Sequence, residues 1–362
     1  MENKKELRTW LDEMQLTHPL VIAGPCSAET EEQVLRIAHE LKDTDATVLR
    51  AGIWKPRTRP GNFEGVGEEG LKWLQKAKAE TGLMTATEVA NPKHVELALK
   101  YDVDILWLGA RTTVSPFIVQ EIADALRGTD KIVLVKNPVN PDLALWLGAV
   151  ERLYTADIKK LGVIHRGFSS FEKSKYRNNP EWQIPIDLQN RFPDLPLISD
   201  PSHITGKRSL IFDVCQTALD FNFDGFMVET HYDPDNAWSD AKQQITPETL
   251  VQMMIDLKVR KKQASSEGYL LELAKLRANI DVLDDKLLGM LGKRMEVADR
   301  IGLLKKDNNV SILQTNRWNE VLGKMILQGE EKGLNEDFIL KIYKAIHQES
   351  INHQKKVINK ID

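Results

Sequence analysis

Side chains that can bind anions or metal ions recur along the first 230 residues, and each follows a short apolar run. They are Cys26, Arg50, Lys55, Arg57, Glu88, Arg111, Lys136, His165, Arg166, His203 and Glu229. Six of them are lysines or arginines, and cations brought together repel one another unless multiply anionic ligands lie between them. The set therefore predicts phosphorylated substrates. The alternative is that each cation is a surface residue of a loop, which explains one such residue better than six.

A second subset has the residue types of a metal site. Cys26, His203 and Glu229 follow three of the apolar runs, and Asp240 lies shortly after the last one. A thiolate, an imidazole and two carboxylates suit a divalent transition ion better than magnesium or calcium. Because these residues are far apart in the sequence, two other interpretations stay open. In the first, Cys26 is a small core residue. In the second, His203 caps a helix that begins near Thr205.

Eight short runs rich in β-branched residues alternate with stretches of helical spacing and must position these side chains. They are Pro19–Ala23, Thr47–Ala51, Leu83–Thr87, Ile105–Gly109, Ile132–Val135, Val163–His165, Leu195–Ser199 and Gly225–Val228. Strands that alternate with helices pair in parallel, and eight over about 240 residues fit a closed (β/α)8 barrel, with an open sheet as the alternative. In such a barrel the carboxyl ends of all strands meet at one mouth, so the reactive residues are expected to share one pocket.

A polar, charged stretch after Lys258 marks a change of organisation. We expect a barrel domain over residues 1–260, a linker over 261–268 and an all-α domain over 269–362. From Leu270 onward apolar residues recur at a spacing of three and four, which predicts one amphipathic helix of about 35 residues followed by two shorter helices. A helix of that length does not bury its apolar stripe alone, so a second chain is expected. A dimerisation coiled coil without catalysis is the simplest alternative.

Helical geometry favours a binding site over that alternative. Arg294 and Lys305 are eleven residues apart, which places them within about 20° of each other on one face of the helix. Arg277 points about 100° away and lies roughly 25 Å along the axis, so it shares a small ligand with them only from another subunit. Ser350 and Gln354 share a face of the last predicted helix.

The bulk composition excludes several classes of function. With 49 Lys and Arg against 53 Asp and Glu, the chain lacks the basic surface that nucleic acid selects. No stretch approaches about 18 uncharged apolar residues, and the first residues lack a signal sequence, so neither a membrane span nor export is expected. Cys26 and Cys215 are the only cysteines, which predicts free thiols and a cytoplasmic enzyme, with Cys215 in the core. Small-molecule substrates are the expected partners.

The motifs of the first 255 residues resemble the 3-deoxy-D-arabino-heptulosonate 7-phosphate (DAHP) synthases. The matching segments are Gly24-Pro25-Cys26-Ser27, Lys55-Pro56-Arg57-Thr58, Gly109-Ala110-Arg111, Lys136-Asn137-Pro138, His165-Arg166-Gly167, Asp200-Pro201-Ser202-His203 and Asp224 through Glu229. The similarity is to the compact branch of these enzymes, which is related to 3-deoxy-manno-octulosonate 8-phosphate synthase. Membership in the octulosonate synthases is therefore the alternative to DAHP synthase. The Lys55-Pro56-Arg57-Thr58 segment favours DAHP synthase, because the octulosonate enzymes usually carry an Ala-Asn-Arg-Ser type sequence there.

This resemblance implies a metal-dependent condensation of phosphoenolpyruvate with erythrose 4-phosphate. Cys26, His203, Glu229 and Asp240 are the implied ligands of one divalent ion, Mn²⁺ or a similar transition metal. The implied binding groups for phosphoenolpyruvate are Arg50, Lys55, Arg111, Lys136 and Arg166. Pro56, Arg57 and Thr58 are implied at the erythrose phosphate, and Glu88 at the attacking water.

Leu270 to Gln354 resembles the all-helical chorismate mutases, which are intertwined dimers of three-helix chains. The match carries Leu276, Arg277, Asp284, Lys286, Leu287, Leu288, Arg294, Lys305, Arg317, Ser350 and Gln354. The resemblance implies that Arg277 of one chain joins Arg294 and Arg317 of the other at the two carboxylates of chorismate. It implies Lys305 and Gln354 at the ether oxygen, Ser350 in the site, and no cofactor. The sequence departs from the family at Gln314, where Asp is frequent, and at Trp318, where many members have a substrate-contacting Glu.

Fusion of an early and a later activity of aromatic biosynthesis predicts feedback. With no regulatory domain ahead of residue 15, the helical domain is the expected sensor, and prephenate or chorismate the expected inhibitor of the barrel. The alternative is a synthase whose helical tail is an inactive dimeriser or ligand sensor. A homodimer through the helical domain, or a higher homo-oligomer, is the expected assembly.

Overall fold

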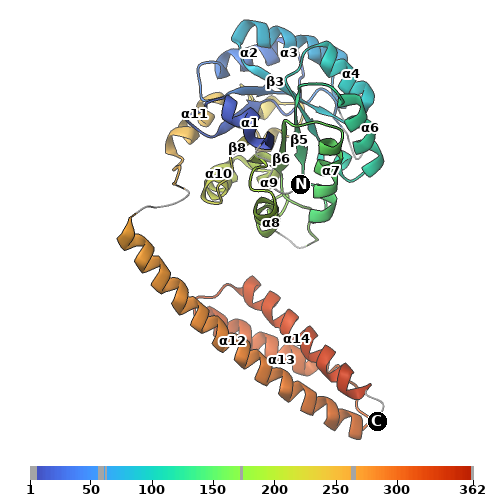
Figure 1. Cartoon of the computed structure of the whole chain (residues 1–362), viewed down its shortest axis with the longest axis vertical. Coiled ribbons are helices and arrows are strands. Elements are labelled where there is room, and N and C mark those ends of the chain that lie inside the picture. The colour runs from blue at the N-terminus through green and yellow to red at the C-terminus, as the bar shows by residue number, and fades with distance from the viewer. Residues whose placement is uncertain (1–5, 56–60, 62, 172–173, 262–265, 360–362) are drawn as a thin grey trace. The chain divides into compact units, whose positions relative to one another are not determined.

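The computed structural model describes residues 6–55, 61, 63–171, 174–261 and 266–359 (Figure 1). The chain divides into two compact units, residues 1–262 and residues 263–362. The clusters of buried apolar side chains lie in the first unit.

Eight parallel strands form a closed barrel in the first unit, in the order β1 to β8. The strands are β1 Leu20–Gly24, β2 Val48–Arg50, β3 Met84–Val89, β4 Ile105–Leu108, β5 Ile132–Lys136, β6 Leu161–His165, β7 Leu197–Ser199 and β8 Gly225–Glu229. Pairing of β1 with both β2 and β8 closes the sheet, with Ile22 opposite Val48 and Gly24 opposite Glu229. The predicted (β/α)8 barrel is therefore confirmed, and the open sheet is wrong. The observed strand ends lie at most two residues from the predicted ones.

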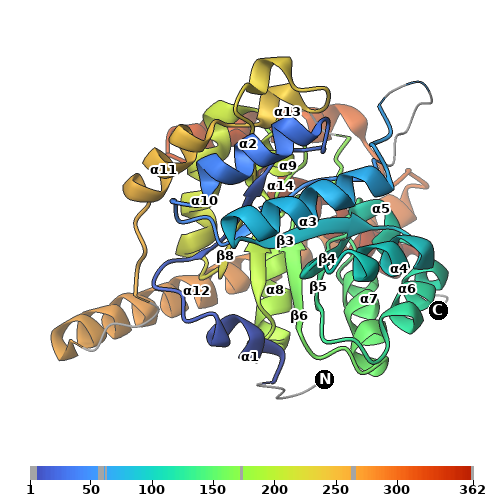
Figure 2. The same cartoon turned by 90° about the horizontal axis from the view of Figure 1, so that it is seen from above.

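Helices surround the strands in both views of the molecule (Figure 1 and Figure 2). They are α1 Glu6–Glu13, α2 Glu31–Leu41, α3 Glu68–Thr81, α4 Pro92–Lys100, α5 Ala110–Thr113, α6 Pro116–Leu126, α7 Leu143–Thr155, α8 Gln183–Arg191, α9 Pro201–Thr205, α10 Ile211–Asp220 and α11 Pro247–Asp256. Short 3-10 turns occur at η1 Arg208–Leu210, η2 Pro234–Asn236 and η3 Ala241–Gln243. Several helices begin at a side-chain cap that the sequence encodes locally, as at Thr30, Asn91 and Asp142.

The strands are buried on both faces, which explains their continuous apolar character. One set of side chains, including Ile22, Ile105 and Ile198, fills the barrel interior. The other set, including Val21 and Leu106, packs under the surrounding helices together with Cys215, which is in the core as predicted. Apolar packing thus fixes the directions of the strand ends, where the site lies.

Helix α1 contributes to the interior cluster at the amino ends of the strands. Trp10 and Leu11 are buried against Leu20 and Ile132, and the Trp10 indole donates a hydrogen bond to the carbonyl of Leu161, the first residue of β6. This end is occupied by packed side chains, so the opposite end is left for the site.

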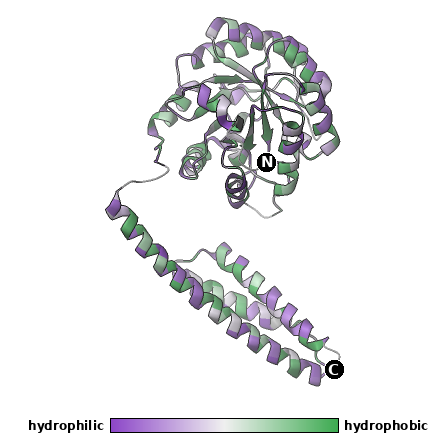
Figure 3. Cartoon of the chain, in the orientation of Figure 1, coloured by the Kyte–Doolittle hydropathy of each residue, from purple (hydrophilic) through white to green (hydrophobic). Residues whose placement is uncertain are grey.

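The second unit consists of α12 Glu267–Asp307, α13 Thr315–Glu330 and α14 Glu336–Ile358. Helix α12 has 41 residues, longer than the 35 or so expected, and extends for about 60 Å. Figure 3 shows hydrophobic positions recurring along its length. Leu276, Ile280, Leu283 and Leu287 in its first half are each more than half exposed. Among the described helices, none is long and apolar enough to cross a membrane.

Candidate functional site

The strand ends of the first unit bring together residues that lie far apart in the sequence. Arg50, the last residue of β2, donates to Glu229 Oε1 at 3.2 Å and to the Cys26 carbonyl at 3.0 Å. Arg50 and Glu229 are almost completely buried, and a buried charge requires such a partner. Closure of the barrel permits this contact, because β1 lies between β2 and β8.

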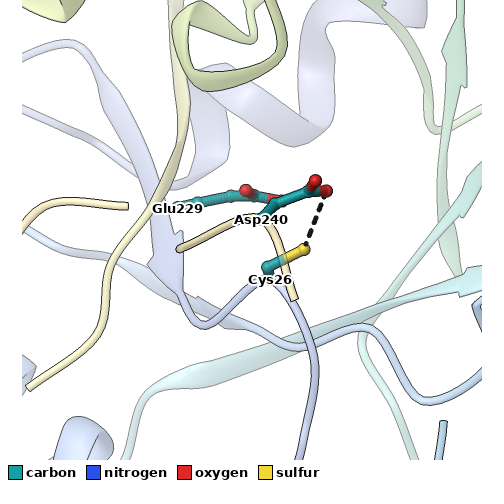
Figure 4. A group of neighbouring side chains, drawn as sticks. All are labelled: Cys26, Glu229 and Asp240. Atoms are coloured by element: carbon teal, nitrogen blue, oxygen red, sulfur yellow. Dashed lines mark hydrogen bonds between the residues drawn. The ribbon is translucent and has the colours of Figure 1, made fainter. Parts of the chain in front are cut away.

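Three metal-ligand residue types form a cluster at this mouth. One ligand atom each of Cys26, Glu229 and Asp240 lies within 4.8 Å of the others, and Figure 4 shows the three side chains pointing toward one another. The Cys26 Sγ and Asp240 Oδ2 are 3.4 Å apart. His203 borders the cluster, with its Nε2 3.7 Å from Glu229 Oε1. A thiol, an imidazole and two carboxylates fit a divalent transition ion.

The electrostatics of Cys26 agree with a site that takes a cation. Burial, together with the Glu229 carboxylate, raises the pKa of the Cys26 thiol to about 12. The Lys55 ammonium lies 2.9 Å from Sγ and acts in the opposite direction. Because a thiolate is the form that binds metal, a divalent ion here would displace the thiol proton.

The two carboxylates of the cluster are held in their charged forms. Burial alone would raise the pKa of Asp240, but Arg177, His203 and Lys55 outweigh it and lower that pKa to about 2. Burial is likewise outweighed at Glu229, where His203 and Arg50 lower the carboxyl pKa. Both side chains are therefore anionic acceptors at neutral pH.

Helix α9 fixes His203 through an acidic cap. Asp200 accepts a hydrogen bond from the His203 backbone N–H as the N-cap of α9, and its Oδ2 lies 2.8 Å from His203 Nδ1. The interpretation of His203 as the cap of a later helix is therefore wrong. Asp200 Oδ2 also pairs with the buried Lys136 at 2.7 Å. One carboxylate thus orients the histidine and balances a strand-end lysine.

Trp107 lies among three of the predicted site residues. Its indole donates to Glu88 Oε2 at 3.0 Å, and its ring centre is 5.0 Å from the Arg50 guanidinium carbon and 5.5 Å from Lys136 Nζ. A Cβ on Gly109 would approach Glu88 Oε1 to 2.3 Å, so the glycine leaves room for this carboxylate. Trp107 thereby links Glu88 to the cationic groups.

The remaining cations lie around this centre with different degrees of burial. Burial lowers the pKa of Arg166 to about 10, and Arg177 and Arg111 add to the effect. The Arg166 guanidinium donates to Asn178 Oδ1 at 2.8 Å. Arg111 is exposed on α5. Pro56, Arg57 and Thr58 lie outside the described residues.

A separate cavity of about 290 Å³ lies within the helical unit. Its walls contain Arg294, Val297, Ala298, Ile301, Lys305, Ile312, Gln314, Arg317, Trp318, Val321, His347, Ser350 and Gln354. Every predicted residue of this site lines the cavity except Arg277, which is exposed on the first half of α12. The cavity has cationic groups around an apolar wall, which fits a small, partly apolar anion.

Contacts between α12 and α14 arrange the polar groups of this cavity. Arg294 donates to the Ser350 hydroxyl, and Lys305 Nζ donates to Gln354 Oε1 at 3.1 Å. A Cβ on Gly302 would lie 3.1 Å from the Gln354 Cα, so this glycine permits the close approach of the two helices. Burial lowers the pKa of Lys305.

Trp318 and His347 form a stacked pair at the cavity wall. Their ring centres are 4.0 Å apart with 17° between the planes. Burial, with a contribution from Arg294, lowers the pKa of the His347 imidazole. The pair therefore presents a neutral aromatic surface beside the guanidinium of Arg294.

Comparison with known proteins assigns both units. The model of the DAHP synthetase I family matches residues 15–265, and the model of chorismate mutase type II matches residues 276–355. The chain belongs to the DAHP synthetase I family. It carries a DAHP synthase domain and a chorismate mutase domain, a transferase and an isomerase of aromatic biosynthesis.

Individual relatives of the DAHP synthase domain cover the barrel. The chain is 31% identical over 238 residues to a phospho-2-dehydro-3-deoxyheptonate aldolase of Thermotoga maritima, covering 66% of this chain and 68% of the relative. A crystal structure of DAHP synthase from that organism superposes with a TM-score of 0.61 at 30% identity, covering 66% and 68% of the two chains. A 2-dehydro-3-deoxyphosphooctonate aldolase of Desulfatibacillum aliphaticivorans is 29% identical, covering 68% of this chain and 93% of the relative.

Several residues of the DAHP synthase and mutase domains were not predicted as site residues. Asp200 has a signal that sequence could have used, since an aspartate followed by proline is a typical helix start. Trp107, Arg177 and His347 have no such signal, because only tertiary contacts place them beside charged groups.

Proposed function

We propose that the barrel condenses phosphoenolpyruvate with erythrose 4-phosphate to DAHP and releases inorganic phosphate, using a divalent transition ion such as Mn²⁺. The cluster of Cys26, Glu229 and Asp240 carries this proposal, because it combines soft and hard ligands beside buried cations. Bound there with His203, the ion would act as a Lewis acid toward the erythrose aldehyde. This interpretation is favoured over an octulosonate synthase by the family match and by the Lys55-Pro56-Arg57-Thr58 segment.

Residues of the chain itself hold and orient the two substrates. Phosphate and carboxylate groups of phosphoenolpyruvate bind Arg50, Lys55, Arg111, Lys136 and Arg166. The erythrose phosphate binds Arg57 and Thr58, and Pro56 lies in the same substrate-binding segment. The methylene carbon of phosphoenolpyruvate forms a bond to the aldehyde carbon with the electron pair of its double bond, and the aldehyde oxygen takes up a proton to become a hydroxyl. Glu88 orients the water that adds to the neighbouring, phosphate-bearing carbon with loss of a proton, after which the bond from this carbon to the phosphate oxygen breaks and the ketone forms. Trp107 holds the Glu88 carboxylate.

We infer that the helical cavity rearranges chorismate to prephenate without a cofactor. Arg294 and Arg317 bind the substrate carboxylates, with Ser350 orienting Arg294. Lys305 and Gln354 share one wall and donate hydrogen bonds to the ether oxygen as its bond to carbon breaks. The rate increases because the cavity holds chorismate in its compact conformer and stabilises the negative charge that develops on the ether oxygen. Gln314 and Trp318 form the side of the cavity that departs from the family pattern.

We propose that two copies of the chain pair through the helical domain. Leu276, Ile280, Leu283 and Leu287 follow one another at helical spacing on α12 and are exposed by 53% to 61%. A contiguous apolar stripe of this kind marks an association surface. Arg277 lies in the same half of α12, so pairing supplies the guanidinium that the cavity lacks.

We propose further that prephenate or chorismate in the helical cavity inhibits condensation in the barrel. The fusion of the two domains supports this link, since binding at one site regulates another through a coupling free energy. We propose a cytoplasmic location for the protein, which agrees with two cysteines that are free thiols.

Removal of divalent ions by exhaustive chelation is expected to abolish condensation and leave the mutase rate unchanged, because the helical site uses no metal. Mn²⁺ added back should restore DAHP formation, measured as phosphate release. Full condensation activity in the chelated enzyme contradicts the metal assignment.

Arg294→Ala is expected to lower the mutase rate by orders of magnitude and to leave condensation measurable, since it removes a carboxylate-binding group. Arg300→Ala, on an exposed part of the same helix, is the matched control. Both rates are measured on the full chain. If Arg294→Ala rearranges chorismate at the parent rate, the mutase site is misassigned. If the parent chain itself has no mutase activity, the helical domain only dimerises or senses ligand.

Leu283→Glu combined with Leu287→Glu is expected to convert the dimer to monomers, observed by light scattering after gel filtration, because buried unpaired charges oppose association. Mixing Arg277→Ala chains with Arg294→Ala chains, under conditions in which subunits exchange, is expected to recover mutase activity. Each mixed dimer then has one site in which both arginines are intact. Failure to recover activity places Arg277 outside the site.

Prephenate is expected to inhibit condensation in the parent chain and to lose this effect in Arg294→Ala, since that variant lacks a ligand-binding group of the helical cavity. Arg300→Ala should stay inhibited. Equal inhibition of the parent and Arg294→Ala would assign the inhibitor to another site.

A further inference from the structure

Two consecutive buried glutamines lie beside the metal-ligand cluster and have no role in the chemistry described above. Gln243 and Gln244 follow Asp240 on the loop after β8 and are 1% and 0% exposed. A buried amide costs free energy unless its donors and acceptors are satisfied, so the partners of these side chains indicate why amides are there.

Gln243 contacts a carboxylate of the cluster directly. Its Nε2 donates to Glu229 Oε2 at 2.7 Å. The other oxygen of that carboxylate, Oε1, accepts from Arg50 at 3.2 Å and faces His203. With both oxygens in fixed contacts, rotation of the Glu229 carboxylate is restricted.

Arg177 connects Gln243 to a second carboxylate. Its Nη1 donates to Gln243 Oε1 at 2.7 Å and to Asp240 Oδ1 at 3.1 Å. A Cβ on Gly206 would approach the Arg177 Cβ to 2.7 Å, so the glycine that ends α9 gives this segment room. The guanidinium thus holds Asp240 and orients the amide of Gln243.

Gln244 spans the gap between the loops that carry Cys26 and Asp240. Its Oε1 accepts from the Cys26 backbone N–H at 2.9 Å, and its Nε2 donates to the carbonyl of Ser239 at 2.8 Å. Asp240 has a left-handed backbone with φ of 47°, which an aspartate adopts only when surrounding contacts offset the strain. Gln244 therefore fixes the separation between the thiol and this carboxylate.

We propose that Gln243 and Gln244, assisted by Arg177, are positioning residues that set the geometry of the Cys26, Glu229 and Asp240 ligand set. The inference rests on the proposed metal-dependent condensation. The Glu229 and Asp240 carboxylates repel each other before a cation binds. Partners that already hold these ligands in place remove the cost of ordering them when the cation binds.

Gln243→Leu and Gln244→Leu remove the amide contacts at similar side-chain volume. Each variant of the full chain, freed of metal by chelation, is expected to bind Co²⁺ about 10- to 100-fold more weakly than the parent, measured by competition with a chromophoric chelator. Gln244→Leu should also shift the thiolate-to-cobalt absorption band, because the Cys26 backbone loses its partner. Gln252→Leu, on the exposed face of α11, is the matched control and should bind Co²⁺ as the parent does.

Arg177→Met provides a second route if either leucine variant does not fold, since the Arg177 side chain is 49% exposed. It is also expected to weaken Co²⁺ binding. Parent-like affinity in the folded variants overturns the positioning role while leaving the metal assignment intact. A parent chain that binds no Co²⁺ or Mn²⁺ overturns the metal assignment itself, and the inference with it.

Discussion

The buried ion pair between Arg50 and Glu229 is the interaction on which the geometry of the barrel mouth depends. The two residues end β2 and β8, on either side of β1, and both are removed from water. An unpaired charge there would be strongly destabilising, so the pair is tolerated only with good geometry and additional hydrogen bonds. The Glu229 carboxylate accepts such a bond from Gln243 Nε2, and the Glu229 backbone N–H donates to the Ser202 hydroxyl, which fixes the backbone at this strand end.

The same requirement for balanced charge extends around the rest of the mouth. Asp200 pairs with Lys136 and His203, and Asp240 pairs with Arg177, so both of these carboxylates have an opposite charge within hydrogen-bonding distance. The Asp200 pairs join β5 to α9, and the Asp240 pair joins Arg177 to the loop after β8. A site built this way is ordered before substrates arrive, which lowers the cost of binding them.

The helical unit follows a different physical rule. Its cavity has few buried residues, and much of the apolar surface of α12 is exposed rather than packed within the chain. The polar groups of the cavity come from α12 and α14, which approach closely at Gly302. The apolar side chains of this unit are therefore less buried than those of the barrel, which pack within the chain.

Local sequence patterns were sufficient to predict the eight strands, the helical tail and the residue types at the strand ends, because strand and helix periodicity and helix caps are local properties. The sequence also determined that Arg277 and Arg294 of one chain do not reach one small ligand, since helix geometry alone sets their separation. Three contacts could not be predicted from such patterns and are seen only in the folded chain: Trp107 lies between Glu88 and Arg50, Arg177 joins Gln243 to Asp240, and His347 stacks on Trp318. These contacts join residues 19 to 66 positions apart, and their geometry follows from barrel closure and helix packing, which no local pattern encodes.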